Sequence, residues 1–270
     1  MIGLLEEQDR KTVVDIWTQA FGDTQNFVYR FFNLSGATTY VYRENGLVLG
    51  FVNLLDVTIN EKKGGYVFAL AVDEKYRGRG IGSKLLEYVD ITLTNKGYSF
   101  AIVIPEPYNK LKQLYCSCGF DDEIYLFTTQ FKKAEQTKDF RITKAAAEET
   151  FNAWQTRKNT VCHSKEFFRY VYADLIDDGS QFVKVDCNGQ SAFCVCYPKE
   201  KCVIIKEVSN CESLDDISQA VMHMLDVDKA IYVSSRGDRK YPYALLKKYE
   251  PLLDSELYAN FLLDGFVNRL

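Results

Sequence analysis

Residues 70–86 read LAVDEKYRGRGIGSKLL, which predicts a buried strand, then a basic, glycine-rich turn, and then an amphipathic helix. The glycines Gly78, Gly80 and Gly82 carry no Cβ, so the backbone there can approach an anion closely and successive N–H groups can converge on it. The helix that opens at Gly80 adds the positive end of its dipole. We therefore predict that this turn binds a diphosphate group.

Hydrophobic periodicity and turn residues predict the other elements of the first half of the chain. Apolar residues three and four apart predict helices over residues 9–20 and 23–34. Asn45-Gly46 predicts a hairpin turn, and Lys63-Gly64-Gly65 predicts a second turn. The remaining expected elements are strands over residues 39–43, 47–59, 66–72, 98–104 and 120–131, and helices over residues 80–96 and 110–118.

The second half repeats this order of elements, which indicates an internal duplication. A polar stretch at residues 132–139 holds almost no apolar residue and is predicted to be a linker. The sequence therefore predicts an α/β protein with mixed sheets (α+β) and two domains, at residues 1–134 and 140–270. The elements expected in the second domain are strands over residues 140–142, 181–186, 191–197, 202–208, 230–234 and 256–263, and helices over residues 145–157, 165–177, 214–226 and 243–248.

Composition narrows the class of protein. With 270 residues, 47% of them hydrophobic, the chain is long enough for two globular cores. The net charge of −4 and the scattered basic residues argue against a nucleic-acid partner. The first residues are too few and too acidic for a signal peptide or membrane span, so we expect a soluble protein without a membrane partner.

The cysteines are predicted to be reduced thiols in a cytoplasmic protein, because several lie inside apolar strands. The pairs Cys116/Cys118 and Cys194/Cys196 have a one-residue gap, whereas zinc ligands are usually separated by two to four residues. We therefore expect packing and no metal. The sequence also lacks the Gly-Lys-Ser/Thr motif of nucleotide P-loops and any motif for a serine or cysteine nucleophile, which argues against kinases and hydrolases.

Two motifs together resemble the Gcn5-related N-acetyltransferase (GNAT) superfamily. Its acyl-coenzyme A motif is Arg or Gln, two residues, Gly, one residue, and Gly or Ala, and Arg77, Gly80 and Gly82 match it. Residues 114–120, LYCSCGF, are similar to the Leu-Tyr, three residues, Gly-Phe signature that precedes the last strands of that family. The two motifs stand in the family's order and at its spacing.

This resemblance implies acetyl-coenzyme A as co-substrate and assigns a role to each motif. Main-chain groups of residues 70–72 would bind the pantetheine arm, amides of residues 78–83 would hold the pyrophosphate, and the hydroxyl of Tyr115 would face the leaving sulfur as a proton donor. An oxyanion donor would be an amide near the end of the same strand. The implied cofactor-binding residues are Leu70, Ala71, Val72, Arg77, Gly78, Arg79, Gly80, Ile81, Gly82, Ser83 and Asn109.

Residues 102–107, IVIPEP, are similar to a branch that includes the mycobacterial enhanced intracellular survival acetyltransferases, in which two GNAT folds are fused. In that branch only the first fold binds the cofactor. Here residues 207–216, EVSNCESLDD, occupy the corresponding place in the second half, without Arg or Gly and with carboxylates that would repel a pyrophosphate. The resemblance thus implies a degenerate second GNAT-like domain that forms part of the acceptor pocket.

The expected reaction is direct transfer of an acetyl group to a primary amine of a small molecule or peptide. The general base stays open among Glu106, Asp264 and the terminal carboxylate of Leu270, because residues 66–72 contain no carboxylate. Two alternatives also remain: an acyl-coenzyme A sensor without turnover, and a transferase of longer acyl or aminoacyl groups. The sequence leaves open whether the chain forms a homo-oligomer.

Overall fold

The computed structural model describes residues 1–135, 139–156, 160–187, 189–209, 213–234 and 237–251. The chain forms two compact units, and each unit takes residues from both halves of the sequence. Of the described residues, unit 1 contains 1–124 and 243–251, and unit 2 contains 125–242. The chain therefore does not divide at the polar stretch between residues 134 and 140.

Unit 1 is built on a mixed sheet. Among its described strands, β4 and β5 run parallel, as expected for two strands joined by a helical crossover, and the other neighbours are antiparallel. The strands, in spatial order, are β1 (Ile2–Leu4), β2 (Thr38–Glu44), β3 (Leu47–Ile59), β4 (Lys62–Val72), β5 (Phe100–Val103) and the last part of β13 (Arg239–Lys248).

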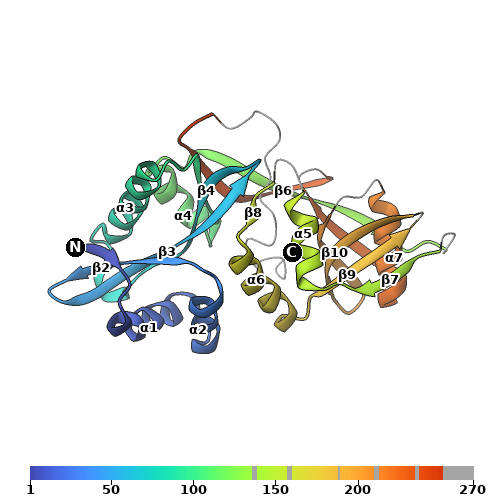
Figure 1. Cartoon of the computed structure of the whole chain (residues 1–270), viewed down its shortest axis with the longest axis horizontal. Coiled ribbons are helices and arrows are strands. Elements are labelled where there is room, and N and C mark those ends of the chain that lie inside the picture. Colours follow the sequence, from blue (N-terminus) through green and yellow to red (C-terminus); the bar gives the residue numbers. More distant parts are fainter. Residues whose placement is uncertain (136–138, 157–159, 188, 210–212, 235–236, 252–270) are drawn as a thin grey trace. The chain divides into compact units, whose positions relative to one another are not determined.

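Helices cover both faces of this sheet (Figure 1). On one face lie α1 (Arg10–Phe21) and α2 (Gln25–Leu34), where Trp17 stacks on Phe51 of β3 at 5.5 Å between ring centroids. On the other lie α3 (Ile81–Asn95) and α4 (Tyr108–Cys116), which pack into one apolar cluster with β3, β4 and β5. The short 3-10 helices η1 (Glu7–Asp9) and η2 (Glu74–Tyr76) precede α1 and α3.

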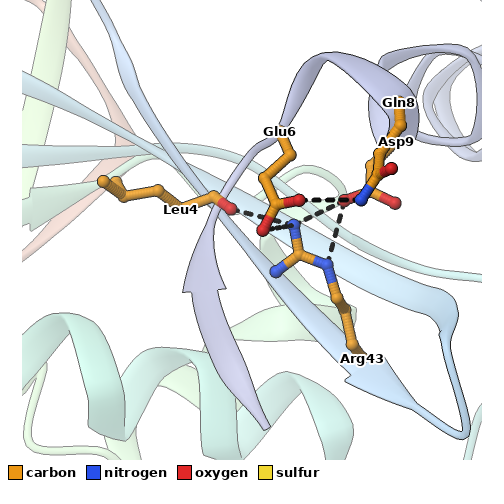
Figure 2. A network of polar contacts seen from close by, with 5 residues as sticks. All are labelled: Leu4, Glu6, Gln8, Asp9 and Arg43. Atoms are coloured by element: carbon orange, nitrogen blue, oxygen red, sulfur yellow. Dashed lines mark hydrogen bonds and ion pairs between the residues drawn. The ribbon is translucent and has the colours of Figure 1, made fainter.

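The start of the chain is anchored to β2 by Arg43 (Figure 2). Its guanidinium donates to both the Asp9 carboxylate and the carbonyl oxygen of Leu4, the latter at 2.9 Å. Glu6 lies 3.7 Å from the same guanidinium. Because the Arg43 and Asp9 side chains are only 19% and 13% exposed, this ion pair joins β1, η1 and β2 in a partly desolvated setting.

Unit 2 repeats the design of unit 1. In its described part, β11 and β12 run parallel and are joined by α7. Helix α7 packs on one face of the sheet, and aromatic side chains of α5 and α6 pack together on the other. The strands, in spatial order, are β6 (Asp122–Lys132), β12 (Lys229–Ser234), β11 (Cys202–Val208), β10 (Gln190–Pro198), β9 (Gln181–Cys187) and β7 (Arg141–Lys144). The helices are α5 (Ala147–Gln155), α6 (Lys165–Asp177) and α7 (Leu214–Leu225), and a short strand, β8 (Cys162–His163), precedes α6.

The predicted duplication is visible in the pairing of the strands. In unit 1 a bulge interrupts the pairing of β3 and β4 next to the parallel pair, and in unit 2 a bulge interrupts the pairing of β10 and β11 at the corresponding place.

Cys194 and Cys196 are fully buried in the core of unit 2 as free thiols, so they pack as small apolar residues.

The helix predicted near the end of the chain is wrong. Residues 243–248 form the end of strand β13 and not a helix. Four consecutive buried residues, Tyr243 to Leu246, are typical of a central strand that is covered on both faces, a pattern that periodicity alone does not distinguish from a buried helix. The strand expected over residues 256–263 lies outside the described residues.

Candidate active site of unit 1

The end of β4 has an irregular backbone. Ala69 adopts φ +49°, which is uncommon for a residue with a Cβ, and two residues of β4 oppose Val52 of β3. The pairing of β4 with β5 ends at Val67 and Val103. Beyond that point the edge of β4 that faced β5 has no further strand pairing in the described sheet.

The predicted residues Leu70, Ala71 and Val72 lie on this open end of β4. Leu70 and Val72 pack against the apolar cluster that α3 and α4 share, and Ala71 is buried. The structure thus brings this strand end and both helices of that face together.

The turn after β4 is shaped by its own side chains. Asp73 accepts a hydrogen bond from the Lys75 amide at 2.9 Å, and Arg77 Nε donates to the carbonyl oxygen of Val72 at 3.1 Å. Gly78 and Gly80 have φ of +76° and +72°, the left-handed region that glycine enters without strain. Arg77 therefore holds the turn against the strand.

The turn leaves the first turn of α3 open to solvent. Gly80 is the N-cap and supplies no side-chain acceptor, so the first amides of α3 remain available. A Cβ built on Gly78 or Gly80 meets no atom within 4 Å, and one on Gly82 meets only Leu70 Cδ2, at 4.0 Å. Open space therefore lies in front of a helix N-terminus, where an anion is favoured.

Arg79 is engaged elsewhere on the surface. Its Nη2 donates to both carboxylate oxygens of Glu44, at 2.8 and 3.0 Å, and its guanidinium lies 5.6 Å from the ring centre of Tyr76. Of the two arginines of the turn, Arg77 contributes to its shape, and Arg79 links it to the end of β2.

Tyr115 lies in α4 and is 5% exposed. It belongs to the same buried cluster as Ile81 and Leu85 of α3. Burial raises the pKa of Tyr115, and the thiol of Cys118 adds a smaller effect in the same direction. The phenol is therefore protonated at neutral pH, as a proton donor must be.

The Gly-Phe motif ends α4 in a tight turn that fixes the backbone of Tyr115. The amides of Cys118 and Phe120 both donate to the carbonyl oxygen of Tyr115, at 3.0 and 3.1 Å. Gly119 has φ +87°, the left-handed conformation common after helix ends. The Phe120 ring packs edge-on against the Tyr115 ring at 6.0 Å.

The other candidate residues lie on exposed segments or outside the described residues. Asn109 is exposed in the first turn of α4, and its role toward a cofactor stays a prediction. Glu106 is exposed on the segment between β5 and α4. Asp264 and the carboxylate of Leu270 lie outside the described residues.

Sequence reasoning missed a polar cluster that lies against the end of α4. Lys247 Nζ is 3.0 Å from the carbonyl oxygen of Cys118 and 2.7 Å from Asp90 Oδ1, which also accepts from the Tyr249 hydroxyl at 2.8 Å. Burial raises the pKa of Tyr249, and the hydrogen bond to Asp90 adds to this. No local pattern could reveal the cluster, because Cys118 and Lys247 are 129 residues apart.

The corresponding turn of unit 2 differs in chemistry. Ser213 caps α7 by accepting from the Asp216 amide at 3.3 Å, and Asp215 and Asp216 place two carboxylates in the first turn. Glu207 at the end of β11 is buried and accepts from Trp154 Nε1 at 3.2 Å. Residues 210–212 of this turn lie outside the described residues, but the described ones disfavour a phosphate.

Two general properties of the described residues bear on the class of site. None of their helices combines the length and apolar character that crossing a lipid bilayer would need. Within the same residues, His, Cys, Asp and Glu side chains do not gather in a group of three that could hold a metal ion.

Comparison with known proteins agrees with this geometry. Residues 35–122 match the family of the acetyltransferase (GNAT) domain. This segment contains β4, the glycine-rich turn, α3 and Tyr115. No curated protein matches the chain significantly by sequence.

Solved structures with the same fold span more than nine tenths of the chain. A probable N-acyltransferase from Enterococcus faecalis V583 is 10% identical, with a TM-score of 0.73 and coverage of 92% of this chain and 72% of that one. Eis1 from Mycobacterium abscessus is 11% identical, with a TM-score of 0.67 and coverage of 92% and 73%.

A tandem GNAT protein from the clavulanic acid biosynthesis pathway is 10% identical, with a TM-score of 0.57. The match covers 93% of this chain and 99% of that one. At these identities the likeness concerns the fold. The duplicated design of the two units agrees with the likeness to a tandem protein. Residues 35–122 therefore match the acetyltransferase (GNAT) domain family, and the chain as a whole has the fold of these N-acyltransferase and tandem GNAT structures.

Proposed function

We propose that the chain transfers an acetyl group from acetyl-coenzyme A to a primary amine of a small molecule or peptide by direct attack. The observation that carries the proposal is the open space before the N-terminus of α3, next to the unpaired end of β4 and the buried Tyr115. These three features share one face of the sheet of unit 1. When bound, acetyl-coenzyme A supplies the acyl group and the thiolate that leaves.

Each part of the site has a distinct role in this proposal. Amides of residues 78–83 hold the diphosphate, and main-chain groups of residues 70–72 hold the pantetheine arm. An amide at the bulge of β4 stabilises the negative charge that develops on the carbonyl oxygen. A neutral amine attacks the acyl carbon, so that a C–N bond forms and the C–S bond breaks.

Tyr115 supplies the proton that the leaving thiolate takes up, and the attacking amine loses a proton to a base or to water. The phenol suits this role because burial keeps it protonated. Residues of β4 provide no carboxylate for the base. Glu106 therefore remains a candidate beside Asp264 and the terminal carboxylate.

The test is release of free thiol from acetyl-coenzyme A with a panel of small amines and lysine peptides. We expect release in the wild type, and a loss of about 100-fold in kcat in Tyr115→Phe with unchanged affinity for coenzyme A. The matched control is Tyr98→Phe, because Tyr98 packs against the same cluster but bonds Asp56 at 2.8 Å. We expect it to keep normal turnover.

Three outcomes would contradict the proposal. Normal turnover in Tyr115→Phe would remove Tyr115 as the proton donor. Thermal stabilisation by acetyl-coenzyme A without thiol release from any amine would indicate a sensor of acyl-coenzyme A. Faster turnover of longer acyl or aminoacyl thioesters than of the acetyl thioester would show that the chain transfers one of those groups and not acetyl.

A further inference from the structure

A lysine near the end of the chain lies against the turn that follows Tyr115. Lys247 Nζ donates to the carbonyl oxygen of Cys118 at 3.0 Å and pairs with Asp90 Oδ1 of α3 at 2.7 Å. The Tyr249 hydroxyl donates to the same carboxylate oxygen at 2.8 Å. Because the Lys247 side chain is 22% exposed and has two partners on different elements, its ammonium is held in one place.

The carbonyl that Lys247 contacts belongs to the turn just after α4, since the helix ends at Cys116 and its C-cap is Ser117. A cation beside the C-terminus of a helix interacts favourably with the helix dipole. A Cβ on Gly119 would lie 3.1 Å from both Cε and Nζ of Lys247. The glycine therefore serves the turn by its positive φ and also leaves room for the lysine.

The turn after α4 also fixes the position of Tyr115. The amides of Cys118 and Phe120 both bond the Tyr115 carbonyl oxygen, so a shift of the turn moves the tyrosine. Leu245, two residues before Lys247, packs in the same buried cluster as Tyr115. Strand β13 thus contacts α4 through Leu245, and it contacts the turn after α4 through the ammonium group of Lys247.

We propose that Lys247, held by Asp90, is a positioning residue that keeps Tyr115 in reach of the leaving sulfur. The proposal rests on the proposed role of Tyr115 as proton donor. A proton donor acts only within hydrogen-bond reach of its acceptor, and a displacement of about 1 Å is enough to lose most of its effect. Lys247 acts through its contacts with the turn after α4 and with Asp90.

The first test measures the turn directly. Lys247→Met keeps the length of the side chain and removes the charge and its donors. We expect the amides of Cys118 and Phe120 to exchange hydrogen about tenfold faster in this variant than in the wild type. The matched control is Lys248→Met, because the neighbouring Lys248 forms an exposed ion pair with Asp122 at 2.9 Å and lies outside the site; its exchange at these amides should be unchanged.

The second test is a double-mutant cycle on kcat. We expect Lys247→Met to lower kcat about tenfold with an unchanged KM for acetyl-coenzyme A, and to cause no further loss when Tyr115→Phe is already present. A lysine that only stabilises the fold would lower kcat by the same factor in both backgrounds. Should Lys247→Met fail to fold, Asp90→Asn removes the anchoring carboxylate and enters the same cycle.

The outcomes separate this inference from the proposed function. Unchanged exchange at Cys118 and Phe120, or equal losses of kcat in both backgrounds, would overturn the positioning role while acetyl transfer by the wild type still stands. Wild-type protein that releases no thiol would overturn the proposed function. In that case the exchange rates still decide whether Lys247 holds the turn.

Discussion

Gly82 differs from the other two glycines of the turn, because its backbone is helical and a side chain there meets only Leu70 at 4.0 Å. The fold accommodates a side chain at this position, and the proposed function places the diphosphate beside it. Gly82→Glu places a carboxylate there, and we expect at least a 100-fold loss of affinity for coenzyme A by calorimetry.

Gly82→Ala is the control for this prediction, with affinity close to wild type, because the related motif accepts alanine. Both variants should melt at the wild-type temperature in the absence of ligand. Wild-type affinity in Gly82→Glu would show that the diphosphate does not bind at this turn.

The raised pKa of Tyr115 predicts the shape of the pH profile. A proton donor acts in its protonated form, and burial keeps this phenol protonated beyond its ordinary pKa of 10.0. We therefore expect kcat to rise as the amine and base deprotonate and then to stay level up to about pH 9.5. A fall between pH 7 and 9 that disappears in Tyr115→Phe would contradict this, measured as kcat against pH at saturating acetyl-coenzyme A.

Among the elements, β1, η1 and β2 are joined by the Arg43 network of Figure 2. Arg43→Met leaves the Asp9 carboxylate without its main partner in a partly buried place. We expect the free energy of unfolding to fall by about 2 kcal/mol, measured by urea denaturation.

The control for this ion pair is Lys248→Met, whose pair with Asp122 is 38% and 48% exposed. An exposed pair of this kind contributes about 0.5 kcal/mol at most. Equal losses in the two variants would show that the burial of Arg43 and Asp9 adds nothing to the strength of their interaction.

Element by element, the first half of the chain was predicted in its correct order, because amphipathic helices and turns carry local signals. The turn expected at Lys63-Gly64-Gly65 is wrong: these residues lie inside β4, and the chain turns at Asn60 and Glu61, which have positive φ. Gly64 is instead required because the Phe100 ring packs where its Cβ would stand. Close approach by a distant ring leaves no local trace in the sequence.

At the scale of the whole molecule, the tandem fold predicts one cofactor per chain. The turn of unit 2 has a serine-capped helix with two carboxylates in its first turn, where unit 1 has an open glycine. We expect calorimetric titration with coenzyme A to saturate at one molecule per chain and Gly82→Glu to abolish the heat. A second equivalent, or heat that persists in Gly82→Glu, would place a site in unit 2.

The amino-acid sequence alone determined the glycine-rich turn, the strand and helix around it, Tyr115 with its Gly-Phe turn, and the repeated order of elements. The helix, strand and turn signals depend on side chains within a few residues of one another, and the resemblance to the GNAT superfamily singled out Tyr115 with its Gly-Phe turn. Only the tertiary structure decided that residues 243–248 form a strand and complete the sheet of unit 1, and that Lys247 and Asp90 meet at the end of α4. Contacts between residues more than a hundred positions apart follow from how strands pair and pack, and single-chain periodicity does not contain that information.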